Sequence, residues 1–250
     1  MKLSATIITL NEEKHIARAI KSVSFADEII VLDSFSTDKT VEIAKSLGAK
    51  VISDKFEGYG QHKNLAEKWA NGEWILSIDA DEEVTPELKK EILQVIESGQ
   101  AKAYQLNRRT SFCGKWIYNG GWYPDKLTRL YKKNEAKWTE PKVHEELKVL
   151  DGSQTPLLKG HLNHYSFPSV ESQIETNIKY AKLGSRQLIE KKGRKPYFFE
   201  VLFRPLGKFI ECYFIKMGLL DGREGLIIAL NASYSLFMKY IFAYSDKSSD

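Results

Sequence analysis

The stretch from Trp74 to Glu83 joins an apolar run to a cluster of acids. Trp-Ile-Leu-Ser-Ile has the composition of a buried β-strand, and Asp79, Asp81 and Glu82 follow it directly. Carboxylates side by side at the end of a buried strand are unfavourable without a counter-charge. Hard divalent cations such as Mg²⁺ and Mn²⁺ take oxygen ligands and supply that charge. The stretch therefore predicts a metal-assisted transfer from a nucleotide-linked donor whose diphosphate must leave.

Asp79 and Asp81 are two residues apart. If the backbone stays extended, both carboxylates point to the same side and can address one ion, directly or through water. The alternative is an acidic helix N-terminus, in which Asp81, Glu82 and Glu83 precede a helix that begins at Pro86. Asp-x-Asp alone is a weak motif. Its position at the end of an apolar strand favours the metal site.

Polar residues also follow two earlier apolar runs. Asp33 closes a run at residues 28–32 and can accept hydrogen bonds from a base N–H or a ribose hydroxyl, although a turn acid is the alternative. Asn11 follows the run at 5–10, and its alternative role is the N-cap of the next helix. Lys63, on a predicted helix, can meet a phosphate or pair with Asp33, or lie on a solvated helix face.

The second half of the chain adds four further candidates. His144 can supply a metal ligand or touch a leaving diphosphate, although a lone histidine is often structural. Asp125 lies in an aromatic segment, and apolar surroundings make a carboxylate a better base. A Pro-Asp turn is the alternative. Trp122 and Tyr123 can stack on a sugar ring.

The first hundred residues alternate between strand and helix patterns. Strands are predicted at residues 5–10, 28–32, 49–52 and 74–78, and helices after Asn11 and at 40–47, 61–69 and 86–98. Such alternation predicts an α/β fold with a mostly parallel sheet flanked by helices. Ligands of such sheets bind beyond the carboxyl ends of the strands. No Gly-x-Gly-x-x-Gly follows the first strand, which disfavours a dinucleotide-binding Rossmann site.

The remaining residues change in character twice. From 101 to 165 the pattern is irregular and aromatic, with strands predicted at 103–106, 127–131 and 157–165 and a loop at 116–124. Beyond Pro168 the chain is helical, and an apolar stripe recurs at three- or four-residue spacing. We therefore expect a domain at 1–167, divided into a nucleotide-binding part (1–100) and an acceptor part (101–167), and a basic amphipathic helical region at 168–250.

The charge of that helical region suggests a partner. Between Lys179 and Lys216 there are ten Lys or Arg against three Glu, a net charge of +7. A basic amphipathic region is typical of contact with an anionic membrane surface. The alternative is a helical annex that packs on the catalytic domain. A transmembrane span is disfavoured because the longest apolar run is interrupted by Asn231, Ser233, Ser235 and Lys239.

Composition excludes several classes of protein. The 250 residues are 42% hydrophobic with 12% aromatic residues, which disfavours disorder, and a net charge of +4 gives no argument for a nucleic-acid partner. Cys113 and Cys212 match no metal or redox spacing, as expected for reduced thiols in the cytoplasm. The N-terminus runs straight into a strand without an apolar core of signal-peptide length.

Three motifs together resemble family 2 glycosyltransferases of the GT-A fold, over about residues 3 to 147. They are Ile-Ile-Thr-Leu-Asn-Glu at 7–12, Ile-Val-Leu-Asp-Ser-Phe-Ser-Thr-Asp-Lys-Thr at 30–40 and Ile-Asp-Ala-Asp-Glu at 78–82. The resemblance implies a nucleotide-sugar donor, Mg²⁺ or Mn²⁺ at the Asp-x-Asp, and inversion at the anomeric carbon. It also implies roles for individual residues, with Asp33 as the uracil-contacting acid, Asp79 near the ribose and donor sugar, and Asp81 as the principal metal ligand. The residues implied beside the nucleoside are Thr9, Asn11 and Glu12.

The later part of the family pattern identifies a candidate base. Pro-Asp-Lys-Leu-Thr-Arg at 124–129 resembles the family's Glu-Asp followed by Leu and Arg, which would make Asp125 the base that deprotonates the acceptor hydroxyl. Pro124 departs from the family's Glu, and Glu145 is the next candidate. The loop after Asp33 also departs from the more common Asp-Asp-Gly-Ser.

A narrower resemblance, carried by residues 121–125, 143–145 and 164–166, is to bacterial lipopolysaccharide-core β-1,4-glucosyltransferases. It implies UDP-glucose as donor, a lipopolysaccharide inner core or another lipid-linked saccharide as acceptor, and a peripheral position on the inner face of the bacterial cytoplasmic membrane. The residues implied near the acceptor are Trp122, Tyr123, Glu145 and His164. Three alternatives remain: a peptide or protein glycosyltransferase of the same fold, a metal-dependent nucleotidyltransferase, and a non-catalytic sugar- or partner-binding module. The second usually needs a glycine-rich phosphate loop near the N-terminus, which residues 11–14 do not provide.

Overall fold

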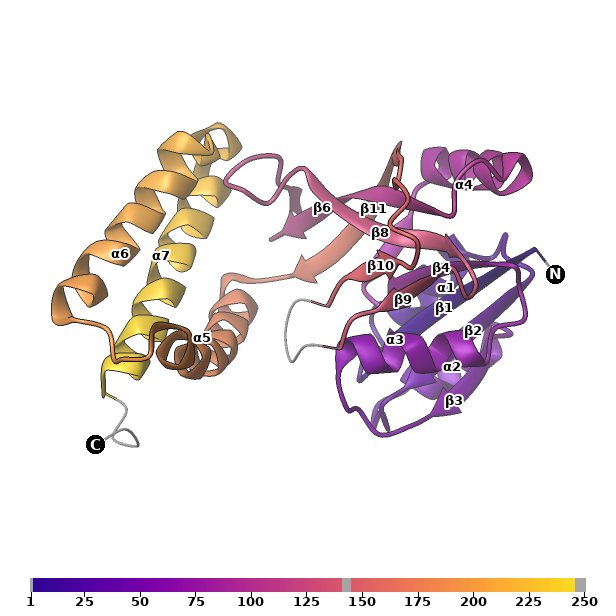
Figure 1. Cartoon of the computed structure of the whole chain (residues 1–250), viewed down its shortest axis with the longest axis horizontal. Helices are drawn as coiled ribbons and strands as arrows, with labels where there is room; N and C mark the ends of the chain where they lie inside the picture. Colours follow the sequence, from indigo (N-terminus) through magenta and orange to yellow (C-terminus); the bar gives the residue numbers. More distant parts are fainter. Residues whose placement is uncertain (1, 141–144, 246–250) are drawn as a thin grey trace. The chain divides into compact units, whose positions relative to one another are not determined.

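The computed structural model describes residues 2–140 and 145–245 (Figure 1). Its first half contains β1 (Leu3–Thr9), α1 (Ile16–Ser22), β2 (Glu28–Asp33), α2 (Thr40–Ser46), β3 (Lys50–Ser53), α3 (Tyr59–Lys68), β4 (Trp74–Asp79), β5 (Glu82–Val84) and α4 (Pro86–Ser98). Its second half contains β6 (Ala103–Phe112), β7 (Lys115–Trp116), β8 (Asp125–Lys132), β9 (Ala136–Trp138), β10 (Leu147–Val149), β11 (Leu157–Phe167), α5 (Val170–Lys192), α6 (Phe198–Ile210), a π-helical turn η1 (Glu211–Ile215), a 3₁₀ turn η2 (Gly218–Asp221) and α7 (Gly222–Ser245). The predicted α/β fold with a helical C-terminal region is confirmed.

The main sheet is mixed, in the order β3-β2-β1-β4-β8-β6-β11-β5. Strands β3, β2, β1 and β4 are parallel, whereas β8 runs antiparallel to β4. Thr9 is the register partner of Asp33, and Ile8 is the partner of Asp79, so the carboxyl ends of β1, β2 and β4 meet at one edge. Because β8 is antiparallel to β4, β8 begins at that same edge, with Asp125. The predicted convergence of polar strand ends is therefore confirmed.

Alternating residues of the sheet build cores on both of its faces. Ile7 packs with Ile16 and Ile20 of α1 and with Leu88 of α4 on one face. The neighbouring Ile8 faces the opposite side. There it packs with Leu32 of β2 and Ala66 of α3. Because both faces of the central strands are covered, all seven residues of β1 are buried and most of β2 and β4 is apolar.

Helix α4 shows how local signals fix an element. Its predicted bounds, 86–98, agree with the structure. The Thr85 side chain accepts a hydrogen bond from the Leu88 N–H as N-cap, Pro86 occupies the first turn, and Gly99 ends the helix with φ 60°. In contrast, the prediction that Asn11 caps the first helix is wrong. Helix α1 begins five residues later and has His15 at its N-cap.

The contacts divide the chain into unit 1 (residues 1–108 and 125–164) and unit 2 (109–124 and 165–250). The domain boundary expected after residue 167 stays a prediction. In unit 2, α7 packs against both α5 and α6 (Figure 1). Asn231 of α7 donates to Gln173 of α5, and Ser233 donates to the Pro205 carbonyl of α6 at 2.8 Å. Polar side chains of α7 thus hold the three helices together.

Candidate active site

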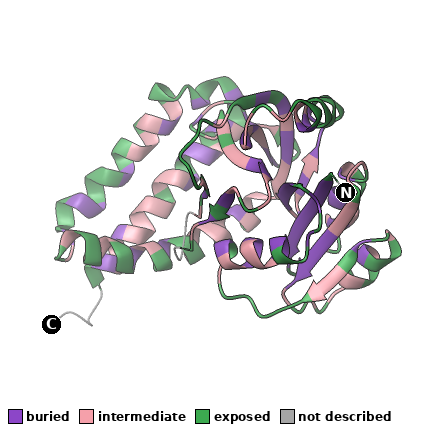
Figure 2. Ribbon diagram, turned by 45° about the vertical axis from the view of Figure 1, so that its right-hand side comes forward, coloured by how far each residue is buried: buried purple, intermediate pink, exposed green. Residues whose placement is uncertain are grey.

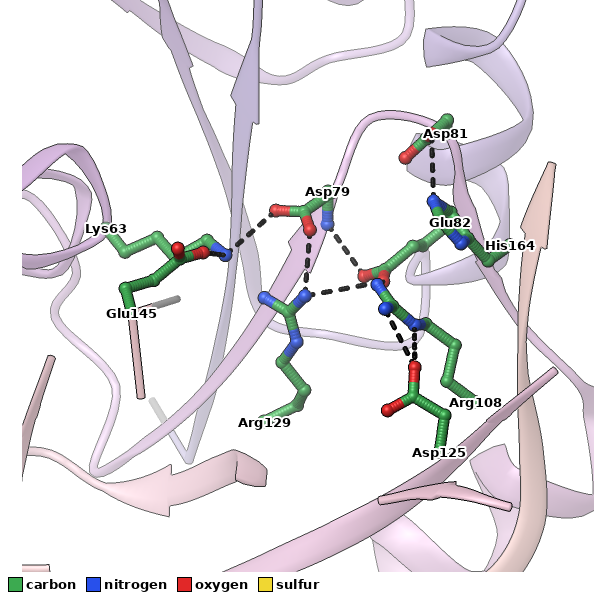
Figure 3. Close-up of polar contacts among 9 residues, drawn as sticks. All are labelled: Lys63, Asp79, Asp81, Glu82, Arg108, Asp125, Arg129, Glu145 and His164. Carbon is green, nitrogen blue, oxygen red and sulfur yellow. Dashed lines mark hydrogen bonds and ion pairs between the residues drawn. The ribbon is translucent and has the colours of Figure 1, made fainter. Parts of the chain in front are cut away.

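The carboxylate of Asp79, at the end of β4, lies between two buried cations (Figure 3). Lys63 Nζ of α3 is 3.2 Å from Oδ1, and Arg129 Nη2 of β8 is 2.8 Å from Oδ2. Lys63 is only 2% exposed and Arg129 3%. Burial alone would raise the pKa of Asp79, but the charges of Arg129 and Lys63 hold it well below its usual range. Asp79 is therefore ionised, and the alternative of Lys63 on a solvated helix face is wrong.

Glu82 is the centre of this network, and the sequence did not identify it. The alternative given for it was the start of the next helix, but it belongs to strand β5, which pairs with β11, and it is 1% exposed. Its carboxylate accepts the Asp79 backbone N–H at 2.9 Å, Arg108 Nη1 at 3.0 Å and Arg129 Nη2 at 3.4 Å. A buried carboxylate needs such partners. Glu82 thereby joins the end of β4 to two arginines from β6 and β8.

Arg108 links Glu82 to the candidate base (Figure 3). Its Nε and Nη2 each lie 2.8 Å from Asp125 Oδ2, while Nη1 binds Glu82. Burial would lower the pKa of Arg108, but Glu82 and Asp125 raise it, so the guanidinium stays charged. A planar guanidinium with several donors holds a carboxylate in a defined orientation. The position of Asp125 at the start of β8 is therefore set by an arginine that sequence reasoning missed.

Asp79 and Asp81 point in different directions, contrary to the extended backbone that we expected (Figure 3). Strand β4 ends at Asp79, and Ala80 and Asp81 form a turn. Asp81 Oδ2 lies 3.1 Å from Nε2 of His164 on β11. Burial would raise the pKa of Asp81, but the hydrogen bond with His164 lowers it. His164, predicted near the acceptor, thus contacts the predicted metal ligand.

The donor set for a divalent cation is only partly visible. Among residues 2–140 and 145–245, no group of three or more His, Cys, Asp or Glu is arranged to hold a metal ion. The Asp81 carboxylate and the His164 imidazole do lie together; the carboxylate is a ligand type that Mg²⁺ and Mn²⁺ both take, and imidazole is a ligand type of transition-metal ions. They fit a site with two protein ligands whose remaining positions are open to donor oxygens. The predicted ligand His144 lies outside the described residues.

Glu145 lies on the Asp79 side of the site. Its Oε1 is 3.0 Å from Lys63 Nζ, so Lys63 bridges Glu145 and Asp79. Both buried cations lie over the indole ring of Trp138. The ring centroid is 4.6 Å from Lys63 Nζ and 5.4 Å from the guanidinium carbon of Arg129. Such cation–π contacts favour buried positive charge. Glu145 was predicted near the acceptor. Its contact with Lys63 places it on the side of Asp79, the candidate donor-binding acid.

The loops after β1 and β2 are tied together by side-chain hydrogen bonds. Asp33 is buried and accepts the Ser36 N–H at 3.0 Å and the Ser36 hydroxyl at 2.5 Å. The Asn11 N–H donates to Ser36 Oγ at 2.8 Å, and Asn11 Oδ1 accepts the Thr37 N–H at 2.8 Å. Asn11 has φ 55°, a conformation that asparagine tolerates well. These hydrogen bonds join Asn11, Asp33, Ser36 and Thr37 at the ends of β1 and β2, and this group is called the strand-end wall.

Thr9 and Glu12 lie beside that wall. Thr9 is buried, and its hydroxyl has no hydrogen-bond partner among the described residues. The Glu12 N–H donates to the Thr40 hydroxyl at 2.8 Å, and its carboxylate is 2.8 Å from His15 Nδ1. Burial raises the pKa of Glu12. The four residues predicted beside the nucleoside thus come together at the ends of β1 and β2.

His62 is a further residue that sequence reasoning missed. It is 2% exposed, its Nε2 lies 3.0 Å from the Ser34 hydroxyl, and burial lowers its pKa. A hollow opens next to it, lined in part by Asp54, Gln61 and Asn64. The signal that could have found it is the polar run at residues 61–64, which directly precedes the apolar part of α3.

Trp122 and Tyr123 make their described ring contacts within unit 2. Trp122 packs 6.0 Å from Phe112 and 5.6 Å from Phe167, measured between ring centroids. Tyr123 lies 5.4 Å from Tyr118. These contacts give both rings a packing role, and their predicted contact with a sugar stays a prediction.

Comparisons with known proteins identify the family. The model of glycosyl transferase family 2 matches residues 4–151. An uncharacterized glycosyltransferase of Rickettsia typhi is 34% identical over 95% of this chain and 85% of its own length. The lipopolysaccharide core biosynthesis glycosyltransferase LpsC of Rhizobium meliloti is 27% identical over 95% of this chain and 90% of its own.

A solved structure shows the same fold. Residues 1–349 of Staphylococcus aureus TarS, in complex with UDP-GlcNAc, align with a TM-score of 0.50 and 16% identity over 98% of this chain and 89% of that one. The predicted GT-A fold is thereby confirmed. Because the family model matches residues 4–151 and a relative matches along 95% of the chain, this protein belongs to glycosyl transferase family 2.

Proposed function

We propose that the chain transfers a hexose, with glucose as the first candidate, from a UDP-sugar to a lipid-linked saccharide, with inversion at the anomeric carbon. The observation that carries this proposal is the pairing of two strand-end acids with different partners. Asp79 is bound by Lys63 and Arg129, whereas Asp125, 32% exposed in its side chain, is oriented by Arg108. One acid is thus suited to donor binding and the other to proton transfer.

The donor half of the proposal rests on the strand-end wall. Asp33 is buried with its carboxylate fixed by Ser36, so it is pre-organised to accept hydrogen bonds from a pyrimidine base. Lys63 and Arg129 lie at the end of β4, where they are paired with Asp79, Glu145 and Glu82. A buried acid that can bind a base, at the same sheet edge as a network of charged groups, fits a donor that carries both a base and a diphosphate.

The acceptor half rests on Asp125 and on a relative. The Asp125 carboxylate takes the proton of the acceptor hydroxyl while that oxygen bonds to the anomeric carbon, and the bond to UDP breaks with its electron pair leaving on the diphosphate. Arg108 keeps the carboxylate oriented for this step. The name of the relative LpsC, a lipopolysaccharide core biosynthesis glycosyltransferase, supports a lipopolysaccharide inner core as the first acceptor to try.

Asp81 and His164 are the residues that would hold Mg²⁺ or Mn²⁺ in this proposal. The bound ion would act as a Lewis acid that neutralises charge on the leaving diphosphate. A readout that does not depend on activity tests this site. Mn²⁺ should raise the melting temperature of the wild-type chain and not that of Asp81→Asn. An equal shift in both proteins would remove Asp81 from the metal site.

The function itself is tested by product analysis. We expect purified protein with UDP-glucose, Mn²⁺ and a lipopolysaccharide inner-core acceptor to release UDP and to extend the acceptor by one hexose. A panel with other UDP-sugars and with peptide acceptors defines the specificity. Release of pyrophosphate would instead identify a nucleotidyltransferase. Retention of transfer by Asp79→Asn and Asp81→Asn together would contradict the assigned site.

The location in this proposal is the inner face of the bacterial cytoplasmic membrane, where the chain is peripheral. Support comes from the excess of basic residues in the C-terminal helices, because a lipid-linked acceptor brings its enzyme to an anionic surface. Fractionation of cells should find the protein with the membranes at low salt. Release into the soluble fraction by carbonate is expected, and resistance to carbonate would contradict a peripheral position.

A further inference from the structure

Helix α6 exposes large apolar side chains along one side. Phe199 is 58% exposed, Phe203 65% and Leu206 55%. In Figure 2 exposed residues recur along this outer helix of unit 2. The same side also carries Leu202 and Ile210, both exposed. These five residues are called the α6 apolar face below.

The α6 apolar face is not the face that packs within unit 2. Val201 and Pro205, four residues apart, are buried, and the Pro205 carbonyl accepts the hydrogen bond from Ser233 of α7. Phe199 and Phe203, also four apart, lie on a different side of the helix. Helix α6 thus has one apolar stripe for α7 and a second one that faces solvent in the described structure.

The α6 apolar face is a large apolar area for the surface of a soluble protein. A phenylalanine side chain contributes about 200 Å², so Phe199 and Phe203 alone expose on the order of 250 Å² of apolar surface. The three aliphatic members of the face bring it to the size of patches that mark interaction sites in soluble proteins. The exposed apolar residues continue along the chain with Phe214, Ile215, Leu219 and Leu220.

Basic residues accompany this apolar face. Between Lys191 and Lys216 the chain has seven Lys or Arg and two Glu, a net charge of +5. Each of the two acids is held by two cations: Glu200 by Lys192 and Arg194, and Glu211 by Lys208 and Lys216. The segments that precede and follow the face in the chain, together with α6 itself, therefore carry an excess of positive charge, and both acids among them are paired with cations.

We propose that the α6 apolar face is a docking surface for an anionic lipid bilayer, with α6 lying in the plane of the membrane interface. An exposed apolar helix face within a basic segment fits the boundary between acyl chains and acidic headgroups. Each Lys or Arg near such a surface adds to the attraction. The inference rests on the proposed peripheral location and is independent of the proposed reaction.

Two other occupants fit the observations less well. A second copy of the chain would bring two surfaces of charge +5 against each other, which is repulsive. A span by α7 is suggested by length and composition, because Gly218–Ser245 is apolar enough to cross a membrane and an 18-residue apolar stretch of it is only 28% buried. However, Asn231 and Ser233 of α7 bind α5 and α6, and Lys239 packs against Gly184 of α5. These contacts belong to a helical bundle.

The test is co-sedimentation of the full chain with phosphatidylcholine vesicles, with and without phosphatidylglycerol. We expect the wild type to bind the vesicles that contain phosphatidylglycerol and to be released by high salt. Phe199→Ser with Phe203→Ser should weaken this binding at least about a hundredfold, since each buried phenylalanine contributes about one decade of affinity or more. Arg204→Glu should weaken binding to anionic vesicles only.

The matched control lies on α5. Tyr180 and Leu183 are 46% and 49% exposed and three residues apart, so Tyr180→Ser with Leu183→Ser removes the same kind of surface from another helix of unit 2. It should bind like the wild type. Circular dichroism checks folding, and UDP release checks the proposed reaction separately.

Several results would overturn the docking surface. They are failure of the wild type to bind anionic vesicles, wild-type binding by the phenylalanine variant, and an equal loss in the α5 control. A doubled mass in solution that reverts to the monomer in the phenylalanine variant would assign the face to a second copy. Loss of UDP release with vesicle binding intact would overturn the proposed reaction and leave the docking surface standing.

Discussion

Unit 1 and unit 2 differ in which residue types they bury and expose: unit 1 buries charged residues, whereas unit 2 exposes large apolar ones. Unit 1 buries Lys63, Arg129 and Glu82, which are residue types that are rarely buried unless paired. Unit 2 exposes Phe199 and Phe203, which ordinarily lie inside. Both departures are unfavourable for folding alone, and such departures tend to mark functional sites. The proposed chemistry thus depends on the buried charges of unit 1, and the proposed membrane attachment depends on the exposed apolar face of unit 2.

The largest effect is expected where the network of unit 1 reaches solvent, at Asp125. Asp125→Asn keeps the shape of the side chain but removes its ability to take a proton. We expect the rate of sugar transfer to fall by about 10²- to 10⁴-fold, with the affinity for UDP unchanged. Steady-state UDP release and calorimetric UDP binding measure the two quantities. Asp151→Asn, at an exposed position of unit 1, is the control. Near-normal turnover in Asp125→Asn would move the base role to Glu145.

Stability compares the two units directly. Arg129→Met leaves the carboxylates of Asp79 and Glu82 without a shared cation, so the free energy of unfolding should fall by about 3–5 kcal/mol. Phe203→Ser in unit 2 should change it by no more than about 0.5 kcal/mol, because the ring is already exposed. Urea unfolding of both variants gives the comparison. Similar losses in the two would mean that the α6 apolar face is part of a folded core.

Arg108 tests whether the network positions the base as well as stabilising the fold. In Arg108→Lys the charge stays, but a single ammonium cannot hold Glu82 and Asp125 together. We expect kcat to fall about ten- to a hundredfold, with KM for the donor little changed. Arg109→Lys, at the next position of β6, is the matched control. A rise of about ten- to a hundredfold in KM for the donor, without loss of kcat, would assign Arg108 to donor binding instead.

The smallest effect is expected in unit 2, from pH. Hydrogen bonds from Lys192, the Tyr197 N–H and Arg194 lower the pKa of Glu200 from 4.5 to about 2. Because the folded pKa is below the unfolded one, Glu200 stabilises the fold above pH 4.5, and this contribution is lost as the pH falls towards 2. Glu200→Gln should therefore lower the melting temperature at pH 7 and flatten its decrease between pH 4.5 and 2. Glu175→Gln, on the exposed side of α5, serves as the reference, and an identical pH profile in both would contradict the role of Glu200.

Much of the nucleotide-binding half could be predicted from the sequence. The bounds of α4 followed from Thr85, Pro86 and Gly99, because capping is decided by neighbours in the chain. The approach of Asn11, Asp33 and the Asp-x-Asp followed from strand–helix alternation, because parallel strands end at one edge. The family motifs at these strand ends predicted the family, and the match over residues 4–151 confirmed it.

The partners of the acids were decided only by the tertiary structure. Arg108, Arg129 and His164 reach Asp125, Asp79 and Asp81 because β6, β8 and β11 join the sheet antiparallel or far from their sequence neighbours. No local pattern encodes which cation meets which carboxylate across such pairings. The turn at Ala80–Asp81 likewise separated two acids that an extended chain would have aligned.

The same division holds in unit 2. The sequence by itself determined that the C-terminal helices are amphipathic and basic, because spacing and charge are properties of the chain. Only the packing on α7 decided that Val201 and Pro205 are covered while Phe199 and Phe203 face solvent. A helix can present two apolar stripes, and which of them is buried depends on the neighbour that the fold supplies.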